Sequence, residues 1–443
     1  MIEIDGHDFD QIQRAFLRAS KETEAPLLII AKTVIGKGAP TKAGTHGCHG
    51  APLGAEEVAA TKKALGFDPE KSFYVPQEVY DAFAARGALC HRWRNMDVRA
   101  EKDAAKAAAP APITREQLLA ALPKFDPEKP VATRAANGAV MNALADVFTN
   151  LVGGSADLEG SNKTGLKKYG WISAEDFTGR NFHWGVRELA MSAMVNGLTA
   201  YEDFRAFGAT FFVFSDYCRP AIRLAAIMEV PSIFVFSHDS FYVGEDGPTH
   251  EPIEQIAAMR TMPNVLSFRP ADANETGYAW VEMLMNTKGP SCILTTRQNL
   301  PILEGTSADG VAKGAYVIWQ AGEQAKGTVL FLATGSEVSL AIEAAKRLWE
   351  EDRIPARVVS MPSVERFLAQ PCAYRETVVP EHMTKRVIVE AGTRFGWDRF
   401  RLDFKTTKFI TKDDFGASGP YKVLAKEFGF TVDNVLAAAR SLI

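Results

Sequence analysis

One short stretch of the chain, residues 236 to 252, gathers side chains suited to proton transfer. It reads Phe-Ser-His-Asp-Ser-Phe-Tyr-Val-Gly-Glu-Asp-Gly-Pro-Thr-His-Glu-Pro and follows the apolar run from Pro231 to Phe236. Open α/β sheets bind ligands in the loops that follow the carboxyl ends of their strands. The imidazoles of His238 and His250 can move protons near neutral pH, and Asp246 can bind a hydroxyl group. For any one of these residues alone, a Gly-Pro turn with solvated charges is the alternative.

A carboxylate and three aromatic rings in the preceding segment are further candidates. Glu188 stands at an apolar helix start, where a buried carboxylate needs a partner. A salt bridge to Arg187 or an interaction with the helix dipole is the ordinary explanation. Phe211, Phe214 and Tyr217 recur every three residues, so they are expected on one side of a helix. Such a stripe is usually core packing, but it can also form a flat wall for a ligand ring.

The motifs together resemble one enzyme family. His-Asp-Ser followed by Gly-Glu-Asp-Gly-Pro-Thr-His in the loop after residue 237 is similar to the signature of transketolase. The resemblance includes Gly-Gly-Ser-Ala-Asp-Leu from residue 153, Thr-Phe-Phe-Val-Phe-Ser-Asp-Tyr from residue 210 and Gly-Thr-His-Gly-Cys-His-Gly-Ala-Pro-Leu from residue 44. It implies a thiamine-diphosphate enzyme that transfers a two-carbon ketol unit from a ketose phosphate, such as xylulose 5-phosphate, to an aldose phosphate, such as ribose 5-phosphate.

The resemblance also implies which residues bind the cofactor. Glu188 matches the glutamate that bonds to the aminopyrimidine ring and activates the cofactor. The aromatic trio matches the residues that surround that ring, and Asp157 matches a residue near the thiazolium. His49 matches a histidine that touches both the diphosphate and the substrate. The implied cofactor-binding positions are therefore His49, Asp157, Glu188, Phe211, Phe214 and Tyr217.

The implied substrate-binding positions are His49, Arg134, Ser161, His238, Asp246, His250 and Arg297. Arginine forks suit a phosphate because two parallel N–H bonds match its oxygen atoms. Taken alone, each arginine could equally be a surface residue or part of an ion pair. Asp157 and Ser161 could equally be ordinary helix caps. The resemblance implies Glu188, His250 and His49 as the catalytic groups.

Magnesium is implied as well, but its ligands are not apparent. The family supplies them from a Gly-Asp-Gly motif and a later Asn, since Mg²⁺ prefers hard oxygen donors. No Gly-Asp-Gly occurs here, and the comparison predicts that the chain begins after that motif, so no residue of this chain is assigned to the metal. His46 and His49 are spaced like a metal pair, but no third ligand is apparent nearby.

Composition narrows the class of protein. The 443 residues, 47% of them hydrophobic, suffice for two or three domains. A net charge of −4 without a Lys/Arg cluster argues against nucleic-acid binding. The five scattered cysteines favour a reducing, cytoplasmic location. Neither an export signal nor a membrane-spanning run is indicated.

The hydrophobic pattern predicts an α/β fold with doubly wound, mostly parallel sheets. An amphipathic helix is expected from residue 9 to 20, and a parallel strand buried on both faces from 27 to 35. A strand that enters a loop is expected at 151–157, and a strand, a Gly-Ser turn and a helix start at 328–338. Further strands are expected at 231–236, 293–296, 357–361 and 386–390, with helices at 186–198 and 211–228. The turn at residues 334–337 is expected to connect a strand to a helix, with anion binding at the helix start as the alternative.

By the resemblance, residues 1–106 are the end of a diphosphate-binding domain with linker helices, 107–303 a pyrimidine-binding domain of the thiamine-diphosphate-binding fold, and 304–443 a transketolase C-terminal domain. The chain is expected to act as a homodimer or with a separate diphosphate-domain chain, as a split-enzyme subunit or a truncation. Dihydroxyacetone synthase, another thiamine-diphosphate enzyme subunit and a non-catalytic transketolase-like protein are the alternatives. Glu188, His250 and Arg297 argue against the last.

Overall fold

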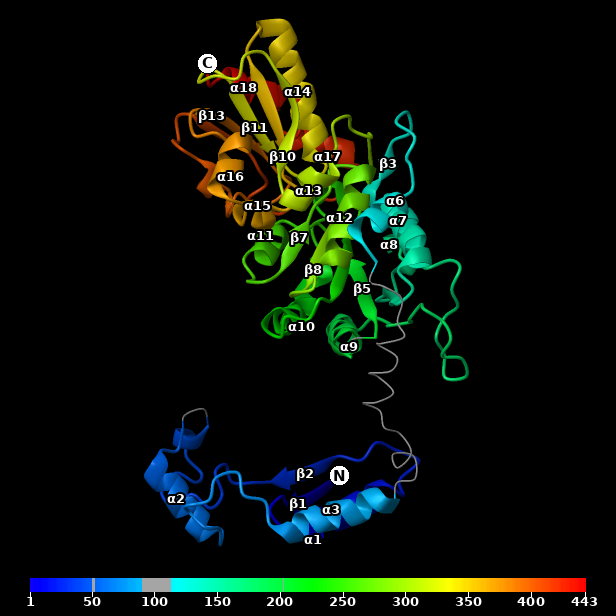
Figure 1. Cartoon of the computed structure of the whole chain (residues 1–443), viewed down its shortest axis with the longest axis vertical. Helices are drawn as coiled ribbons and strands as arrows, with labels where there is room; N and C mark the ends of the chain where they lie inside the picture. The colour runs from blue at the N-terminus through cyan, green and yellow to red at the C-terminus, as the bar shows by residue number, and fades with distance from the viewer. Residues whose placement is uncertain (50–51, 90–112, 202) are drawn as a thin grey trace. The chain divides into compact units, whose positions relative to one another are not determined.

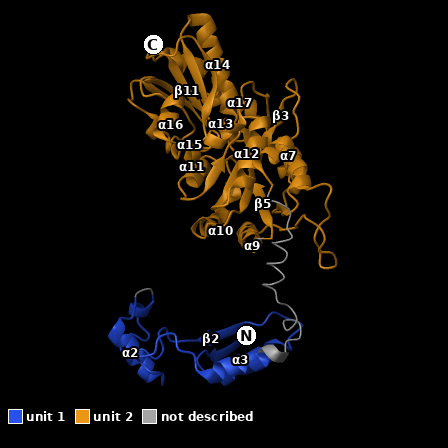
Figure 2. Ribbon diagram, viewed as in Figure 1, with its two compact units in different colours: residues 1–110 blue, residues 111–443 orange. Residues whose placement is uncertain are grey.

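The computed structural model describes residues 1–49, 52–89, 113–201 and 203–443. The chain divides into two compact units, residues 1–110 and residues 111–443 (Figure 2). The predicted boundary between residues 106 and 107 lies outside the described residues.

Unit 1 contains a two-stranded parallel sheet. Its strands are β1 (Ile2–Asp5) and β2 (Ile29–Lys32), and helix α1 (Phe9–Ala19) packs against β1. The side chain of Asp8 caps α1 by accepting bonds from the N–H groups of residues 10 and 11, so the predicted helix is confirmed. Helices α2 (Ala55–Ala64) and α3 (Gln77–Leu89) and the short η1 (His46–Cys48) complete the unit.

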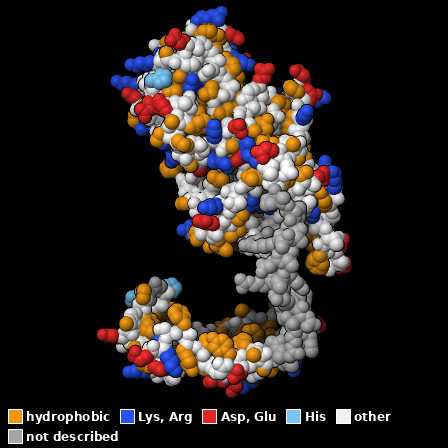
Figure 3. All heavy atoms as spheres, viewed as in Figure 1, with side chains coloured by type: hydrophobic (Ala, Val, Ile, Leu, Met, Phe, Trp, Pro, Cys, Tyr) orange, Lys and Arg blue, Asp and Glu red, His pale blue; other side chains and the backbone are white. Residues whose placement is uncertain are grey.

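The prediction that the strand near residue 30 is buried on both faces is wrong. In β2, Ile29 and Ile30 are half-buried, and Ala31 and Lys32 are exposed. The physical reason is that β2 pairs with β1 alone within the described part of this unit. Apolar side chains consequently gather on the visible surface of unit 1 (Figure 3). The exposed apolar residues include Phe9, Phe16, Leu17, Leu28, Val34, Ile35, Tyr80 and Phe83.

Unit 2 begins with a five-stranded, fully parallel sheet (Figure 1). Its order is β4 (Leu151–Ser155), β5 (Arg205–Phe211), β6 (Ile233–Ser237), β8 (Ser291–Thr295) and β7 (Leu266–Phe268). Alternate residues of β6 enter two different cores: Ile233 and Val235 join one, and Phe234 and Phe236 join the other. The sheet is therefore covered on both faces, as the sequence predicts.

Helices on the two faces supply these cores. Helices α7 (Thr133–Val147) and α12 (Ala273–Met285) cover one face, and α9 (Glu188–Ala200), α10 (Ser215–Ile227) and α11 (Gln255–Arg260) cover the other. The shorter elements are α6 (Arg115–Ala120), α8 (Glu159–Asn162), η3 (Phe241–Val243) and an antiparallel pair, β3 (Val131–Ala132) with β9 (Asn299–Leu300).

The prediction of one helix from residue 211 to 228 is wrong at its start. Residue 211 ends strand β5, residues Phe212–Phe214 form η2, and α10 begins at Ser215. The strand was missed because its sequence, Arg-Ala-Phe-Gly-Ala-Thr-Phe, contains little of the β-branched pattern typical of strands. Tertiary packing stabilises it: all seven residues are buried, and Gly208 leaves room for Met191 and Val195 of α9.

A second five-stranded sheet follows in unit 2, which we call the C-terminal sheet segment (residues 304–443). Its order is β10 (Tyr316–Ala321), β12 (Ala356–Ser360), β11 (Val329–Ala333), β13 (Lys385–Val389) and β14 (Thr407–Ile410). The strands are parallel except β10, whose antiparallel pairing with β12 the sequence did not predict.

Helices α14 (Glu337–Asp352) and α18 (Val432–Arg440) cover one face of this sheet, and α15 (Val364–Leu368) and α16 (Cys372–Val378) cover the other. The remaining elements are α13 (Ala308–Lys313), η4 (Trp397–Phe400) and α17 (Tyr421–Glu427). One apolar core includes side chains of both sheets. Of the helices that are described, none is both long and apolar enough to cross a bilayer.

The backbone at Phe182 lies close to Gly154 of β4, and a substitution at Gly154 tests this contact. A Cβ at residue 154 would collide with the carbonyl oxygen of Phe182, whose N–H bonds to Gly153. We expect Gly154→Ala to lower the free energy of unfolding by about 2 kcal/mol or more, because backbone cannot yield as a side chain does. Urea unfolding followed by circular dichroism measures it.

Gly160→Ala is the matched control, because a Cβ there meets nothing within 4 Å. Its unfolding free energy should stay close to that of the unmodified protein. Equal stabilities of the two variants would show that the segment at residue 182 is not packed against β4.

Candidate active site

Two arginines far apart in the sequence are brought together by a small backbone clamp. Strands β3 and β9 pair, and the N–H and hydroxyl groups of Thr133 bond to the hydroxyl and N–H groups of Thr296 at 2.7 to 3.1 Å. Arg134 and Arg297 directly follow these two threonines. The clamp therefore fixes two guanidinium groups at the carboxyl edge of the first sheet.

The two arginines affect each other electrostatically. Burial lowers the pKa of Arg134 below its ordinary value, and the positive charge of Arg297 lowers it further. Arg134 Nη1 donates to the carbonyl of Ser161 at 2.9 Å, which places two predicted phosphate ligands side by side. Arg297 Nη1 donates to the carbonyl of Val243 at 3.0 Å and to Glu245 Oε2 at 3.1 Å. Among the described residues, Arg297 pairs with a carboxylate and Arg134 does not, so positive potential remains for an anion.

His238 is held by a chain of hydrogen bonds. It follows β6 in the left-handed conformation, with a φ of 62°. Ser237 Oγ lies 2.7 Å from His238 Nδ1 and donates to Asn162 Oδ1 at 2.6 Å, and Asn162 Nδ2 donates to Ser155 Oγ at 3.0 Å. Since the single hydroxyl proton of Ser237 goes to Asn162, we infer that Nδ1 of His238 carries a proton and that its Nε2 is the free acceptor.

This imidazole is uncharged near neutral pH. Burial lowers the pKa of His238 from 6.5 to about 3, and the charges of Arg134, Arg297 and His250 act in the same direction. A bound phosphate dianion would oppose these causes, because an opposite charge nearby favours the protonated ring.

The predicted aromatic residues do form a connected wall, although they do not share one helix. The centroids of Phe211 and Phe214 lie 6.1 Å apart, and those of Phe214 and Tyr217 lie 6.2 Å apart. Phe211 also stacks on His238 at 3.7 Å, and Phe214 meets His250 edge-on at 5.6 Å. The wall opens outward, since Phe211 is buried, Phe214 is half-buried and Tyr217 is 62% exposed.

Glu188 lies in the first turn of α9, half-buried and facing α10. Burial raises the pKa of the Cys218 thiol of α10 to about 12, and the Glu188 charge contributes to this rise. Cys218 directly follows Tyr217 in α10, so the Glu188 charge acts on the same helix turn that carries Tyr217. Arg187 donates to the carbonyl of Trp184 at 3.2 Å, which replaces the salt bridge considered from the sequence.

The other predicted residues lie in exposed loops. Asp157 follows β4 in the left-handed conformation, with a φ of 58°. It does not cap α8, whose N-cap is Leu158. Asp246 is exposed in the loop that contains both histidines, and the Nδ1 of His250 lies 2.9 Å from the hydroxyl of Thr249. His49 is exposed at the end of η1 in unit 1.

Sequence reasoning missed Asn162, Ser237 and Glu245. Ser237 had a recognisable signal, because it lies between the apolar strand and His238. Asn162 had none, since its bond to Ser237 joins positions 75 residues apart. Glu245 belongs to the predicted loop, but its pairing with Arg297 depends on the fold.

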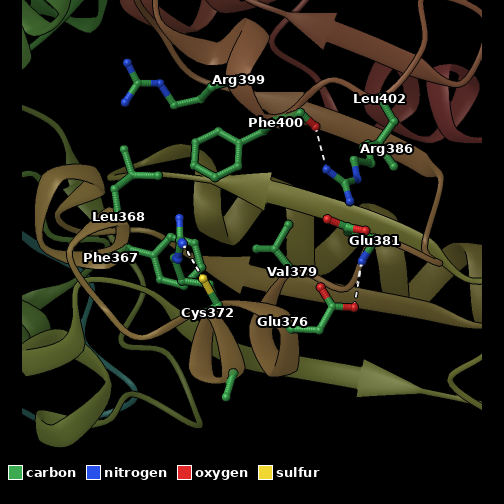
Figure 4. Close-up of a pocket in the computed structure, with 12 residues that line it drawn as sticks. Phe367, Leu368, Cys372, Glu376, Val379, Glu381, Arg386, Arg399, Phe400 and Leu402 are labelled. Carbon is green, nitrogen blue, oxygen red and sulfur yellow. Dashed lines mark hydrogen bonds between the residues drawn. The ribbon is translucent and has the colours of Figure 1, made fainter.

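A separate cavity of about 540 Å³ lies in the C-terminal sheet segment, where Cys372, Glu376, Arg386 and Arg399 are among its lining residues (Figure 4). None of the predicted site residues lines it. Among the described residues, no group of three His, Cys, Asp or Glu side chains is arranged to hold a metal ion.

The residues near α9 and α10 suit one half of a cofactor with an aromatic ring. An open aromatic wall can stack on a flat heterocycle, and a half-buried carboxylate nearby can bond to a ring nitrogen. The fold and this arrangement define the class of thiamine-diphosphate-binding enzymes. In agreement, the family described as Transketolase, thiamine diphosphate binding domain matches residues 1–118, and Transketolase, pyrimidine binding domain matches residues 129–302. Transketolase-like TK C-terminal domain matches residues 314–431.

The chain belongs to the transketolase family. It is 45% identical over 455 residues to the transketolase of Bacillus subtilis, which covers 99% of this chain and 67% of that protein. The solved transketolase from Leishmania mexicana is similar with a TM-score of 0.81 and 37% identity, over 100% of this chain and 66% of that one. The chain thus spans about two thirds of the length of these relatives. They are transketolases, which are transferases, and the predicted family and fold are confirmed.

Two further solved structures are informative. A transketolase from Pichia stipitis in complex with sedoheptulose-7-phosphate is 35% identical, with a TM-score of 0.79, over 100% of this chain and 66% of that one. A split gene transketolase, described as an inactive tetramer of four beta chains, is 26% identical, with a TM-score of 0.56, over 70% of this chain and 98% of that one.

The lowered pKa of His238 predicts how stability depends on pH. Between its ordinary value of 6.5 and about 3, the unfolded chain binds a proton that the native ring does not bind, so stability falls as the pH falls. His238→Asn should reduce this slope by up to about 1.4 kcal/mol per pH unit, and Asn tolerates the left-handed backbone. Urea unfolding at several pH values measures the slope.

His382→Asn is the control, because His382 is exposed on the surface. It should leave the slope unchanged. A slope for His238→Asn equal to that of the unmodified protein would mean that His238 is solvated and protonates normally.

Proposed function

We propose that this chain carries the pyrimidine-binding and C-terminal parts of a transketolase that transfers a two-carbon ketol unit from a ketose phosphate to an aldose phosphate. The observation that carries the proposal is the juxtaposition of Arg134, Arg297 and His238 beside an open aromatic wall. The arginines supply charge for a phosphate, and the wall supplies a stacking surface for a cofactor ring.

Thiamine diphosphate is the cofactor of the proposed reaction and, when bound, would supply a nucleophilic carbon and an electron sink for cleavage of the C–C bond beside the donor carbonyl. Phe211, Phe214 and Tyr217 would hold its aminopyrimidine ring and exclude water from it. Glu188 would hold the proton shared with the ring nitrogen. Asp157 would lie near the positive thiazolium.

The magnesium ion and the diphosphate are assigned to the diphosphate-binding domain. Mg²⁺ requires oxygen ligands in octahedral geometry, usually carboxylates together with phosphates. His49 of unit 1 would contact the diphosphate and the substrate, and its exposed position in the loop that ends η1 leaves it accessible to both.

The substrate phosphate is assigned to Arg134, Ser161, Arg297 and His238. Arg134 and Ser161 are already in contact through the backbone of the latter. Asp246 would bind a hydroxyl group of the sugar, and His250 would polarise its carbonyl or transfer a proton. The sugar phosphate in the related Pichia stipitis structure supports this class of substrate.

We further propose that the chain works as an assembly, either a homodimer or a complex with a separate diphosphate-domain chain. The exposed apolar residues of unit 1 and the open edges of its two-stranded sheet support a covering partner. The inactive tetramer of the split gene relative supports a requirement for a second kind of chain. A cytoplasmic location is part of the proposal, supported by the scattered cysteines, of which residues 48, 218, 292 and 372 are unpaired.

The role of Glu188 is tested by transfer of a ¹³C-labelled unit from xylulose 5-phosphate to ribose 5-phosphate. The full chain is assayed with Mg²⁺ and thiamine diphosphate, with and without a supplied diphosphate-domain chain. We expect Glu188→Gln to lower kcat by about 100-fold or more, because the amide cannot share the ring proton. The exposed Glu343→Gln of α14 should retain activity.

Unchanged turnover in Glu188→Gln would remove this residue from catalysis. Absence of transfer by the unmodified chain in both mixtures would favour a non-catalytic transketolase-like protein. Transfer to formaldehyde in place of ribose 5-phosphate would favour a dihydroxyacetone synthase.

The arginine pair predicts selectivity for phosphorylated donors. In the same assay, Arg134→Ala and Arg297→Ala should each raise the KM for xylulose 5-phosphate by about 10- to 100-fold, because each removes a charge-assisted bond. The KM for unphosphorylated xylulose should change little. Arg399→Ala, in the separate cavity, is the matched control and should leave both values unchanged. Equal losses with both sugars would place the arginines away from the phosphate.

A further inference from the structure

The loop that contains both site histidines, residues 238–251, makes polar contacts with the C-terminal sheet segment at two places, and between them Phe241 packs against Leu424 and Phe430 of that segment. We call this stretch the site loop. At its start, Asp239 Oδ2 accepts a bond of 2.8 Å from Arg269 Nε. Arg269 follows β7 of the first sheet, and its Nη1 pairs with Glu337 at the start of α14. One arginine therefore joins the site loop to the second sheet.

The Asp239, Arg269 and Glu337 triad is completely buried, with each side chain at most 1% exposed. Arg269 Nη1 also donates to the carbonyl of Thr334 at 2.9 Å, and Glu337 accepts from the N–H of Ala391 at 2.9 Å. The turn at residues 334–337 thus receives a cation, not the anion considered from the sequence. A buried charge with satisfied bonds has few alternative positions, so the triad fixes Asp239 tightly.

The second contact lies at the far end of the site loop. Ser418 Oγ donates to the carbonyl of Glu245 at 2.7 Å. The carboxylate of Glu251 occupies the place that a side chain at Gly416 would take, and Gly244 packs against the carbonyl of Gly419. Residues 416–419 therefore support the loop between Gly244 and Glu251, next to His250.

The conformation of the loop explains why such support is needed. His238 holds a left-handed φ of 62°, which a non-glycine residue adopts at a cost. The loop has few regular hydrogen bonds of its own, since η3 is its single short helix in the structure as described. Residues 155–162 support the ring of His238 from one side, and the triad holds the next residue from the other.

We propose that the C-terminal sheet segment positions the sugar-phosphate site: Arg269, Asp239 and Glu337 hold His238, and residues 416–419 hold His250. These are positioning residues, because none of them belongs to the site itself. The assignment of the loop to a sugar phosphate rests on the proposed function. The mechanical coupling does not, because it follows from the contacts of the loop and Arg269 with the C-terminal sheet segment.

Hydrogen exchange of the full chain, followed by mass spectrometry without any ligand, tests the coupling. Glu337→Gln keeps the shape of the side chain and removes its charge, so exchange of the amides from 238 to 243 should speed up by about tenfold. Ser418→Ala removes one exposed hydroxyl and does not threaten folding. It should speed up exchange around residues 244–247 only.

Glu275→Gln is the matched control. Glu275 is also a buried carboxylate between the two sheets, bonded to Tyr316 and Ser360 of the second sheet at 2.7 and 2.6 Å, but it has no bond to the site loop. Its loss should leave exchange of the loop unchanged. Loop exchange unaltered in both Glu337→Gln and Ser418→Ala, or raised equally by Glu275→Gln, would overturn the proposal.

Transfer assays with the supplied diphosphate-domain chain then separate the coupling from the function. Ser418→Ala should raise the KM for xylulose 5-phosphate several-fold at nearly unchanged kcat, and Ser418→Thr, which keeps a hydroxyl, should restore it. If loop exchange is faster in the variants but the unmodified protein transfers nothing, the coupling is supported and the proposed function is refuted. A loosened loop with unchanged KM would refute the positioning role while leaving the proposed function intact.

Discussion

The site depends on holding two like charges close together. Arg134 and Arg297 repel each other, and the repulsion is one cause of the lowered pKa of Arg134. The fold opposes this with hydrogen bonds between uncharged groups: the backbone pairing of β3 with β9 and the N–H-to-hydroxyl bonds between Thr133 and Thr296. The result is a positive potential that exists before any ligand arrives. A binding anion would relieve the repulsion, so part of its affinity is already built into the fold.

The same logic explains why the histidine between these charges is neutral. A charged His238 beside two guanidinium groups would add a third positive charge to a buried site. The chain through Ser237 and Asn162 instead fixes its tautomer, leaving one nitrogen available as an acceptor. Stacking on Phe211 orients the ring further. The proposed phosphate site and the aromatic wall are therefore in contact, so a change in the packing of one is expected to alter the other.

The sequence predicted the parts that depend on local pattern. The buried strands β4, β6 and β11 follow from apolar runs that end in polar loops, and the loop with His238 and His250 follows from its position after such a strand. Prediction from the sequence failed where tertiary packing determines the local structure. Strand β5 forms because α9 packs on Gly208, and Phe211, Phe214 and Tyr217 form a wall across a strand, a turn and a helix. The Thr133 to Thr296 and Asn162 to Ser237 bonds join distant positions that no local pattern marks.

A loop that carries catalytic groups has to be irregular to present them, and irregular backbone supplies few bonds to hold itself. In this chain the missing rigidity is provided from outside, by a hydrogen-bonded chain at residues 155–162 and by buried charges that reach into the second sheet. Directional bonds and apolar packing therefore act together on this loop, since Phe241 packs against Leu424 and Phe430, while a shared apolar core joins the two sheets.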